Sequence, residues 1–425
     1  MSFTEAVNLS EKIHQSSFSV SWLLESLRKN DETFIKLHGN RSVKKVTHYD
    51  VADGKGFIST VNRCTIEFID SVDDKDVYTT ILKIPSFYSL ENILNSEDSG
   101  KMWFTDENRK ALTKVHEFEC KFYTILAPII DVPAPNVYNT VDWILNEQEG
   151  CIHMEDLTST GKTTSYFDNI NLTQIKCFIR HLAHWHKNIL CADPEIWKKK
   201  FISKAMEAFG TALEGIGQQG KKFIEESSLK DQFAPLLEKY HCLCLNTDYT
   251  NFANKVQFED LKIQKVIIHS DMHSGNIMWA IDEGGNIQND IAAFVDWQGM
   301  SEGSPMEDLA KFLVYCADGV VRRQAEQFAI EYYFECLSKE YGDSDKVPYT
   351  LAQLKKAYNL AFSSQAVYGI PASMFFFGGI QQIESNQNLL NSYKDYGYLK
   401  TLHLFQDLER LLTGDLKEEY DKFNC

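Results

Sequence analysis

The sequence has few of the features that mark nucleic-acid-binding, membrane or secreted proteins. Only eight of its 43 basic residues are arginine, and 60 acidic residues give the 425-residue chain a formal net charge of −17. A phosphate backbone would repel so acidic a protein, which argues against nucleic acid as a partner. No apolar stretch is long enough for a transmembrane helix, so we expect no membrane association. The residues from Met1 to Ser26 lack the basic start and apolar run of a signal peptide.

Cysteine is present but follows no pattern that implies a metal site. The ten cysteines include no Cys-x-x-Cys pair and no recurring zinc-like spacing. In a chain of this length, scattered cysteines are typical of buried free thiols in a reducing compartment, so we expect a cytoplasmic protein. The composition, with 44% hydrophobic and 24% charged residues, is that of an ordinary globular protein and excludes disordered and fibrous classes.

The N-terminal part of the chain has the pattern of an antiparallel sheet. After a predicted first helix at 16–30, residues 44–85 contain short apolar runs interrupted by glycines and by an acidic stretch, which is typical of strands joined by hairpin turns. A helix is predicted at 107–126, ending before Pro128. Two further short strands are predicted near 137–145 and 151–154.

After Leu157 the apolar residues recur every three to four positions, which predicts a mainly helical region. The segments with this spacing are 172–190, 202–217, 221–243, 305–317, 321–340, 350–367 and 396–413. A small group of predicted strands interrupts them, at 266–268, 277–281 and 292–295. The pattern therefore predicts an α+β protein, in which a β-rich N-terminal part with one long helix precedes a helical part that contains a small sheet.

The residues from His269 to Asn276 form the most informative segment. Asp271 and Asn276 lie five positions apart in a predicted loop between two strands, and Asp296 follows the next strand, 25 residues after Asp271. The sheet can bring these three side chains to one point. Two carboxylates and an amide suit a hard cation, and Mg²⁺ takes one or two carboxylates together with nucleotide phosphates. The remaining carboxylate can orient a hydroxyl and accept its proton, which is most of what phosphoryl transfer requires.

A purely structural interpretation exists for each of these residues. Taken singly, Asp271 and Asn276 could cap turns, as such side chains often do. The triad at this spacing, with a strand on each side, favours the functional interpretation. His269 and His273 could suggest a metal site with Asp296, but no third histidine lies at ligand spacing. We therefore expect both histidines to shape the loop.

A glycine-rich turn is a second, weaker signal. Gly54 and Gly56 lie at a predicted β-turn, where backbone N–H groups could cover phosphates. Ser59 stands where a third glycine would complete the G-x-G-x-x-G pattern, so the pattern is incomplete. Gly54 and Gly56 are therefore candidate nucleotide-binding positions, while an ordinary hairpin turn stays possible.

Lys83 interrupts the apolar run from Ile81 to Ile84. A buried lysine is costly unless its ammonium group meets a charge, which predicts a phosphate and a carboxylate as its partners. Glu119 on the following helix is the best candidate for that carboxylate, because Glu117 is one position off the same face. The alternative is an edge-strand lysine that faces water.

These residues, in this order, resemble the choline-kinase-like and aminoglycoside-phosphotransferase-like kinases. The resemblance is strongest to the ecdysteroid-kinase-like (CHK kinase-like) group and its uncharacterised nematode members, and it extends over roughly residues 40–410. It is most specific at Val266 to Asn276 and at Phe294 to Gly299. Glu119 to Tyr123, Cys151 to Leu157, Leu182 to His186 and Asp308 to Ala310 also fit the family.

The resemblance implies a protein-kinase-like bilobal fold. A small antiparallel β N-lobe with one helix would occupy residues 1–154, a hinge 155–157, and a large, mostly helical C-lobe 158–425, including the catalytic loop and a helical acceptor-site insert. ATP would bind between the lobes. Its adenine would hydrogen-bond to the backbone of the hinge, which makes Glu155 and Leu157 candidate nucleotide-binding residues.

The resemblance also implies a role for each of the other candidate residues. Lys83, held by Glu119, would contact the α- and β-phosphates of ATP. Asp271 would be the catalytic base, and Asn276 and Asp296 would hold Mg²⁺.

Asp308 would be a structural residue that steadies the catalytic loop, together with His269. The family's substrates are small hydroxylated molecules, so we expect an ATP- and Mg²⁺-dependent kinase that acts on a steroid-like, amino-alcohol or xenobiotic hydroxyl. Two alternatives stay open. The incomplete glycine turn is compatible with a pseudokinase that binds nucleotide without turnover. A protein kinase is disfavoured, because Ser270 stands where those enzymes have arginine and no activation segment is visible.

An aromatic-rich segment from Met374 to Gly379 could line an apolar acceptor pocket. Ordinary helix packing explains the same residues, and we favour that interpretation.

Overall fold

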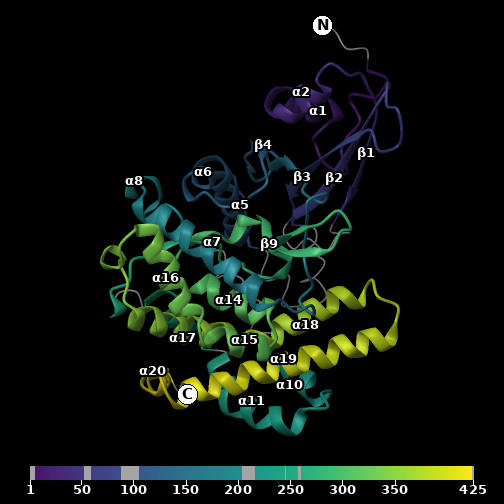
Figure 1. The fold of residues 1–425 in the computed structure, drawn as a ribbon. Helices are drawn as coiled ribbons and strands as arrows, with labels where there is room; N and C mark the ends of the chain where they lie inside the picture. Colours follow the sequence, from purple (N-terminus) through teal and green to yellow (C-terminus); the bar gives the residue numbers. More distant parts are fainter. Residues whose placement is uncertain are drawn as a thin grey trace. The chain divides into compact units, whose positions relative to one another are not determined.

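The computed structural model describes residues 5–51, 59–87, 105–202, 216–244, 246–256 and 260–423. The chain forms two compact units, drawn in Figure 1. The first contains Met1–Ile125 and Ala134–Ser159, and the second contains Leu126–Pro133 and Thr160–Cys425. The predicted glycine turn with Gly54 and Gly56, and most of the predicted helix at 202–217, lie outside the described residues.

The first unit contains a five-stranded antiparallel sheet with the order β1-β2-β3-β5-β4. Its strands are β1 (Val43–Asp50), β2 (Ser59–Phe68), β3 (Val77–Pro85), β4 (Val137–Val141) and β5 (Cys151–Glu155). The central strand, β3, pairs with β2 on one side and β5 on the other, and its residues 80–84 are all buried. Lys83 therefore lies in a central strand, so the edge-strand alternative is wrong.

Two helices precede this sheet, α1 (Val20–Asn30) and α2 (Glu32–His38). The α1 helix begins after Ser19, whose hydroxyl accepts the Trp22 N–H. Its apolar residues at positions 20, 23, 24 and 27 recur on one helical face. They are buried in one cluster with side chains of β1, β2 and β3, which places the core of this unit between the helices and the sheet.

The long helix of the first unit is α5 (Asp106–Lys121), which begins at Thr105 with two acidic residues in its first turn. Negative charge at this end complements the helix dipole. The regular helix ends before the predicted limit of 126, because residues 122–126 form a wider π-type turn. α6 (Ala127–Ile130) follows, with Pro128 in its first turn, where a missing N–H breaks no hydrogen bond. The predicted stop before Pro128 is therefore wrong.

The second unit contains two small antiparallel sheets. In one, β7 (Val266–Ile268), which is buried along its whole length, pairs with β10 (Ser301–Gly303). The other has the order β6-β8-β9 and consists of β6 (Gly161–Lys162), β8 (Ile277–Ile281) and β9 (Ile287–Phe294). The strand predicted at 292–295 begins earlier, because β9 pairs with β8 from Ile287 onward.

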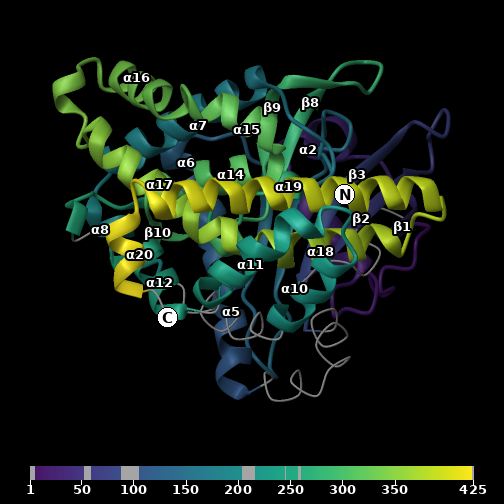
Figure 2. The same ribbon diagram turned by 90° about the horizontal axis from the view of Figure 1, so that it is seen from below.

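Helices make up the rest of the second unit (Figures 1 and 2). They are α7 (Leu172–Cys191), α8 (Pro194–Trp197), α10 (Ile216–Glu225), α11 (Lys230–Cys244), α12 (Thr247–Asn251), α14 (Glu307–Cys316), α15 (Gly319–Glu326), α16 (Ala329–Tyr341), α17 (Leu351–Val367), α18 (Gly369–Gln381), α19 (Gln387–Thr413) and α20 (Lys417–Phe423).

The C-terminal helices differ from the prediction in two places. The sequence pattern did not predict α18, and α19 begins nine residues before the predicted start at 396. Both views show α18 lying along α19, with α10 and α11 beside them. Among the described residues no single helix could cross a membrane. Only α17 and α18 taken together, with a bend of 53° between them, have the necessary length and composition.

Candidate active site

The loop from His269 to Asn276 connects β7 to β8 and carries Asp271. It leaves the buried end of β7, passes through Ser270, and enters β8 by a tight turn at Ser274–Asn276. Ser270 has a φ of 68°, in the left-handed region that only glycine adopts without strain. Such a conformation persists where the surrounding contacts determine it, and it is concentrated at functional sites. The contacts that hold this loop are therefore informative.

Asp308, in the first turn of α14, holds the loop by its backbone. One carboxylate oxygen accepts the His269 N–H at 2.7 Å, and the other accepts the Ser270 N–H at 2.9 Å. The side chain is inaccessible to solvent. Burial raises the pKa of Asp308 to about 7, against the opposing effects of Lys311 and of the two N–H groups. Asp308 therefore fixes the strained residue from inside the unit.

Lys311 and Glu307 complete this support, and the sequence reasoning missed both. The Lys311 ammonium donates to the Ser270 carbonyl and, at 2.8 Å, to Glu307. Burial acts to lower the pKa of Lys311, but Glu307, Asp308 and Asp271 together outweigh it and raise that pKa, so the lysine stays charged. The only signal in the sequence was a Glu–Lys pair four residues apart, which is usually a solvated helical face. We call Glu307, Asp308 and Lys311 the bracing layer.

His269 links the loop to the end of β9. Its Nε2–H donates to the Val295 carbonyl at 2.9 Å, and its Nδ1 accepts the Asp271 N–H at 3.3 Å. The ring is completely buried, and burial lowers the pKa of His269, which keeps it neutral. Each ring nitrogen thus has a fixed role, and the histidine connects the residues before Asp271 with those before Asp296.

The Asp271 side chain is 43% exposed, unlike the layer beneath it. Asn276 Nδ2 donates to the Asp271 carbonyl at 2.8 Å and to its Oδ2 at 3.2 Å, and His273 Nε2 lies 3.8 Å from the same Oδ2. Partial burial acts to raise the pKa of Asp271, but the nearby His273, His269 and Lys311, together with the Asn276 hydrogen bond, outweigh this and lower it. Within the described residues no hydrogen bond reaches Oδ1, so an ionised carboxylate oxygen is available to accept a proton.

Asn276 and Asp296 are brought to the same edge by the β8–β9 pair. Ile277 and Phe294 are partners in that pair, and the Val295 N–H donates to the Asn276 carbonyl at 3.0 Å. Asp296 follows with a φ of 63°, and the buried Trp297 ring anchors the next turn. Because Asn276 uses its Nδ2 to hold Asp271, its amide oxygen remains as a possible ligand. One carboxylate and one amide oxygen suit Mg²⁺, which takes its other ligands from phosphates and water.

The structure describes no cluster of three or more His, Cys, Asp or Glu side chains that could hold a metal ion. Asn276 and Asp296 are only two residues, and asparagine is not one of these four residue types. The donor set therefore fits Mg²⁺ only when it is shared with a ligand such as a nucleotide.

Gly299 approaches the loop from the turn after Asp296. A Cβ on this residue would lie 3.1 Å from the His269 carbonyl oxygen and 3.3 Å from the Asp271 Cβ. Glycine at this position lets the two segments pack closely. Gly299 belongs to the segment in which the family resemblance is most specific, but the sequence predicted no role for it. Its close approach to the loop now gives it a packing role.

In the first unit, Lys83 and Glu119 form a buried ion pair. The Lys83 ammonium lies 2.7 Å from each oxygen of Glu119, and the two residues are 7% and 2% exposed. β3 supplies the lysine and α5 the glutamate. Glu117, the rejected alternative, instead pairs with Lys114 and Lys121. The carboxylate thus supplies the charge partner that a lysine buried in an apolar sheet needs.

The other predicted nucleotide-binding residues of this unit are less informative. The Glu155 carboxylate accepts hydrogen bonds from the backbone and side-chain N–H groups of Asn136, and the Glu155 N–H donates to the Asn136 carbonyl. Leu157 is half-buried just beyond β5. Gly54 and Gly56 lie outside the described residues.

Comparison with known proteins identifies a family. The DUF1679 family model, described as "Uncharacterized oxidoreductase dhs-27", matches residues 27–414. The Caenorhabditis elegans protein "Uncharacterized oxidoreductase dhs-27" is 25% identical over 84% of this chain and 42% of its own length. This chain thus corresponds to less than half of that relative. A second C. elegans protein, "Uncharacterized kinase-like protein D1044.1", is 23% identical over 68% of this chain and 72% of its own length.

Solved structures identify the fold. Choline kinase from Cryptosporidium parvum Iowa II matches with a TM-score of 0.50 at 12% identity, over 94% of this chain and 98% of that one. The fold is protein-kinase-like, with an antiparallel β N-terminal part and a mostly helical C-terminal part, as the sequence predicted.

Proposed function

This chain belongs to the DUF1679 family, and we propose that it is an ATP- and Mg²⁺-dependent phosphotransferase that moves the γ-phosphate to the hydroxyl of a small molecule. The observation that carries the proposal is the 269–276 loop. It presents Asp271, ionised and 43% exposed, on a backbone that the buried bracing layer fixes. Phosphoryl transfer needs mainly positioning and charge stabilisation, and this arrangement provides the positioning.

In the proposed reaction each residue of this chain has a defined task. Asp271 accepts the proton of the acceptor hydroxyl through its free oxygen. Asn276 and Asp296 hold Mg²⁺, which neutralises phosphate charge when it is bound. Lys83, whose ammonium lies 2.7 Å from both Glu119 oxygens, binds the α- and β-phosphates, and Glu119 positions it.

Nucleotide recognition completes the proposal. The backbone near Glu155 and Leu157 would bind the adenine, and the turn with Gly54 and Gly56 would cover the phosphates. Within this proposal, residues 1–154, 155–157 and 158–425 are the N-lobe, hinge and C-lobe. We also propose a cytoplasmic location, since every cysteine whose surroundings the structure describes is a free thiol.

The oxidoreductase name that the family model shares with one relative does not favour hydride transfer for this chain. Dinucleotide-dependent oxidoreductases commonly use a parallel, doubly wound sheet. Every strand pair in the described ranges is antiparallel. The name also belongs to a protein of which this chain matches only 42%. The alternative that remains is a pseudokinase, which would keep nucleotide binding without transfer.

Thermal unfolding with Mg²⁺ and ATP tests nucleotide binding. At a hundredfold excess over the dissociation constant, ATP should raise the melting temperature of the wild type by about 5 °C. Lys83→Met and Asp296→Asn should remove most of this shift. Lys45→Met and Asp290→Asn are matched controls, because they change an exposed lysine of β1 and an exposed aspartate of β9.

Measurement of ADP formation with a panel of small alcohols then separates the two candidates. A phosphotransferase forms ADP together with a phosphate ester. A pseudokinase shows the thermal shift and forms neither. A wild-type protein whose melting temperature ATP leaves unchanged would contradict both.

A further inference from the structure

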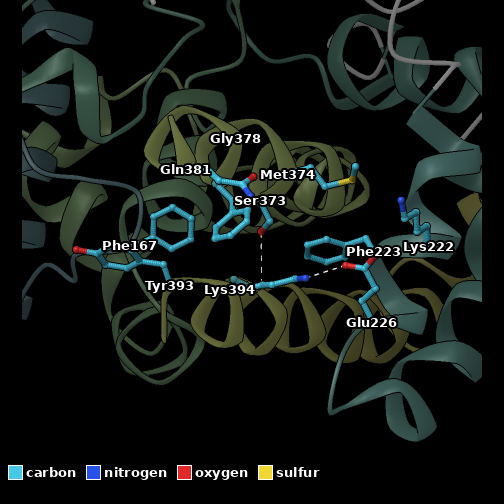
Figure 3. A pocket seen from close by; sticks show the side chains of 12 residues that line it. Phe167, Lys222, Phe223, Glu226, Ser373, Met374, Gly378, Gln381, Tyr393 and Lys394 are labelled. Carbon is cyan, nitrogen blue, oxygen red and sulfur yellow. Dashed lines mark hydrogen bonds and ion pairs between the residues drawn. The ribbon is translucent and has the colours of Figure 1, made fainter. Parts of the chain in front are cut away.

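The second unit contains a cavity of about 450 Å³ among α10, α18, α19 and the segment at Phe167, shown in Figure 3. Its volume lies within the roughly 300–1,000 Å³ that is usual for small-molecule sites. The apolar side chains that line it are Phe167, Phe223, Met374, Phe377 and Tyr393. The expectation that Met374 to Gly379 only pack against other helices is therefore wrong, because this segment supplies one wall.

Aromatic rings form much of the lining, and neighbouring rings hold two of them in place. Phe223 contacts the Tyr398 ring with centroids 4.6 Å apart, and Phe167 contacts the Tyr393 ring at 5.2 Å. On α18, Gly378 also lines the cavity, and a Cβ built on it would meet no atom within 4 Å. Aromatic walls and open space beside a glycine suit a ligand with a flat, apolar ring system.

The charges of the lining are unbalanced. Lys394 and Glu226 form an ion pair at 2.7 Å. This hydrogen bond with Lys394 is the largest influence that lowers the pKa of Glu226, and the charge of Lys222 adds to it. Lys222 itself, on α10, has no hydrogen bond or ion pair in the described part of the chain. Two lysines against one glutamate leave the described lining with one positive charge in excess, in a protein whose net charge is −17.

Gln381 is a second polar group that is available to a ligand. Its side-chain amide has no hydrogen bond to any other described residue. Figure 3 shows Gln381 and Lys222 on opposite sides of Met374. Ser373, by contrast, already hydrogen-bonds to the Tyr166 hydroxyl at 2.9 Å. The cavity therefore offers one ammonium and one amide beside its apolar walls, and the ammonium favours a negatively charged ligand group.

The cavity is separate from the loop that carries Asp271. The Tyr166 ring stacks on Phe376 with centroids 4.7 Å apart, and Phe376 lies 5.4 Å from the His273 ring. His273 in turn faces the Asp271 carboxylate. Because α18 and these three rings lie between the cavity and the proposed base, a molecule bound in the cavity is not the phosphoryl acceptor.

We infer that this cavity is a second binding site, which takes an aromatic monoanion, a ring system that carries one carboxylate or sulfonate group. The rings lie against the aromatic walls, and the anionic group pairs with Lys222. The Gln381 amide hydrogen-bonds to a further polar atom of the ligand. A neutral ring compound would leave the excess charge unpaired. Binding involves no chemical step, so the inference does not rest on the proposed function.

Fluorescence titration with a matched pair of dyes tests the charge. 1-Anilino-8-naphthalenesulfonate carries the anion, and N-phenyl-1-naphthylamine has the same rings without it. Lys222→Met should raise the dissociation constant of the sulfonate by about fivefold and that of the neutral dye by less than about twofold. Lys221→Met is the matched control, because Lys221 is the exposed preceding residue and does not line the cavity. It should change neither dissociation constant.

Substitutions on α18 test the location. Gly378→Leu fills the cavity and should raise the dissociation constants of both dyes by about tenfold or more. Gly379→Leu is its control, since Gly379 is the next residue, has equally open surroundings and does not line the cavity. It should change them by less than about twofold. Asp271→Asn should bind both dyes as the wild type does. Circular dichroism and the melting temperature without dye establish that each variant is folded.

Each part of the inference has a result that would overturn it. The anionic ligand is contradicted if Lys222→Met leaves sulfonate binding unchanged, or weakens the two dyes equally. The cavity is contradicted if Gly378→Leu binds the sulfonate as the wild type does, or if either control loses as much as the variant it matches. Weaker binding by Asp271→Asn would place the dye at the proposed active site and would also overturn the inference. None of these results depends on ADP formation, which tests the proposed function separately.

Discussion

Two aspartates of the candidate site have opposite surroundings. Asp271 lies in the 269–276 loop, and Asp308 accepts hydrogen bonds from the backbone of that loop. Asp271 has a side chain that is 43% exposed, a lowered pKa and one oxygen without a hydrogen bond in the described part of the chain. Asp308 is inaccessible, its pKa is raised to about 7 by burial, and both its oxygens accept backbone N–H groups. The same side chain is thus prepared for chemistry in one place and for support in the other. The environment, and not the residue type, assigns the role.

The largest expected effect comes from removing the chemical role of Asp271. Asp271→Asn removes the proton acceptor but keeps the shape, so the turnover number for ADP formation should fall by about a thousandfold. Because the side chain is half exposed, the free energy of unfolding should change by less than about 0.5 kcal/mol. Steady-state kinetics and urea unfolding measure the two quantities. Asp290→Asn, at an exposed position on β9, should alter neither.

A second substitution removes the structural role of Asp308. Asp308→Ala leaves the His269 and Ser270 N–H groups buried without acceptors and removes a negative charge beside Lys311. The free energy of unfolding should fall by about 3 kcal/mol. Urea denaturation of wild type, Asp308→Ala and Asp271→Asn side by side would show this. If Asp308→Ala were as stable as Asp271→Asn, the bracing layer would not stabilise the folded protein.

The pH dependence of stability sharpens the comparison further. The pKa of Asp308 is about 7 in the folded protein and near 4 when unfolded, so between these values the folded state binds more protons. The free energy of unfolding therefore falls as pH rises from about 4 to about 7. Asp308→Asn removes this contribution, while Lys311 and Glu307 remain. The difference in stability, wild type minus Asp308→Asn, should be larger at pH 5 than at pH 8, on the order of 2 kcal/mol. A difference independent of pH would contradict the raised pKa.

The smallest expected effect comes from Gly299, which packs against the loop that carries Asp271. In Gly299→Ala, the new Cβ would lie 3.1 Å from the His269 carbonyl oxygen and 3.3 Å from the Asp271 Cβ, so the loop must shift by a few tenths of an ångström. The turnover number should fall by about threefold through altered positioning. The shift in melting temperature with Mg²⁺ and ATP should be unchanged. A loss as large as that of Asp271→Asn would show that the loop tolerates no displacement at all.

Much of the loop that carries Asp271 was predictable, because its residues are close in sequence. Asp271 and Asn276 lie five apart in one loop, and the buried strands on either side were visible as apolar runs. Lys83 was predicted to need a carboxylate, and the helix periodicity was enough to prefer Glu119. Which strands flank β3 was not predictable, because strand order depends on pairing between distant segments.

The residues that sequence reasoning missed depend on tertiary burial. Glu307 and Lys311 have the spacing of a solvated helical pair, but packing buries them under the loop. For the segment Met374 to Gly379 the sequence favoured ordinary helix packing, whereas Met374, Phe377 and Gly378 line a cavity. Pro128 suggested a helix stop, yet proline fits in the first turn of a new helix. In each case the local pattern permitted two outcomes, and long-range contacts decided between them.

The most direct test of the account is identification of the reaction product. The wild type would be incubated with Mg²⁺ and ATP labelled with ¹⁸O in the γ-phosphate, together with a panel of small alcohols, and the product would be examined by mass spectrometry. We expect a labelled alkyl phosphate and ADP in equal amounts from the wild type, and about a thousandfold less of both from Asp271→Asn. Inorganic phosphate as the only labelled product, formed equally fast by both proteins, would contradict the role of Asp271 and the account built on it.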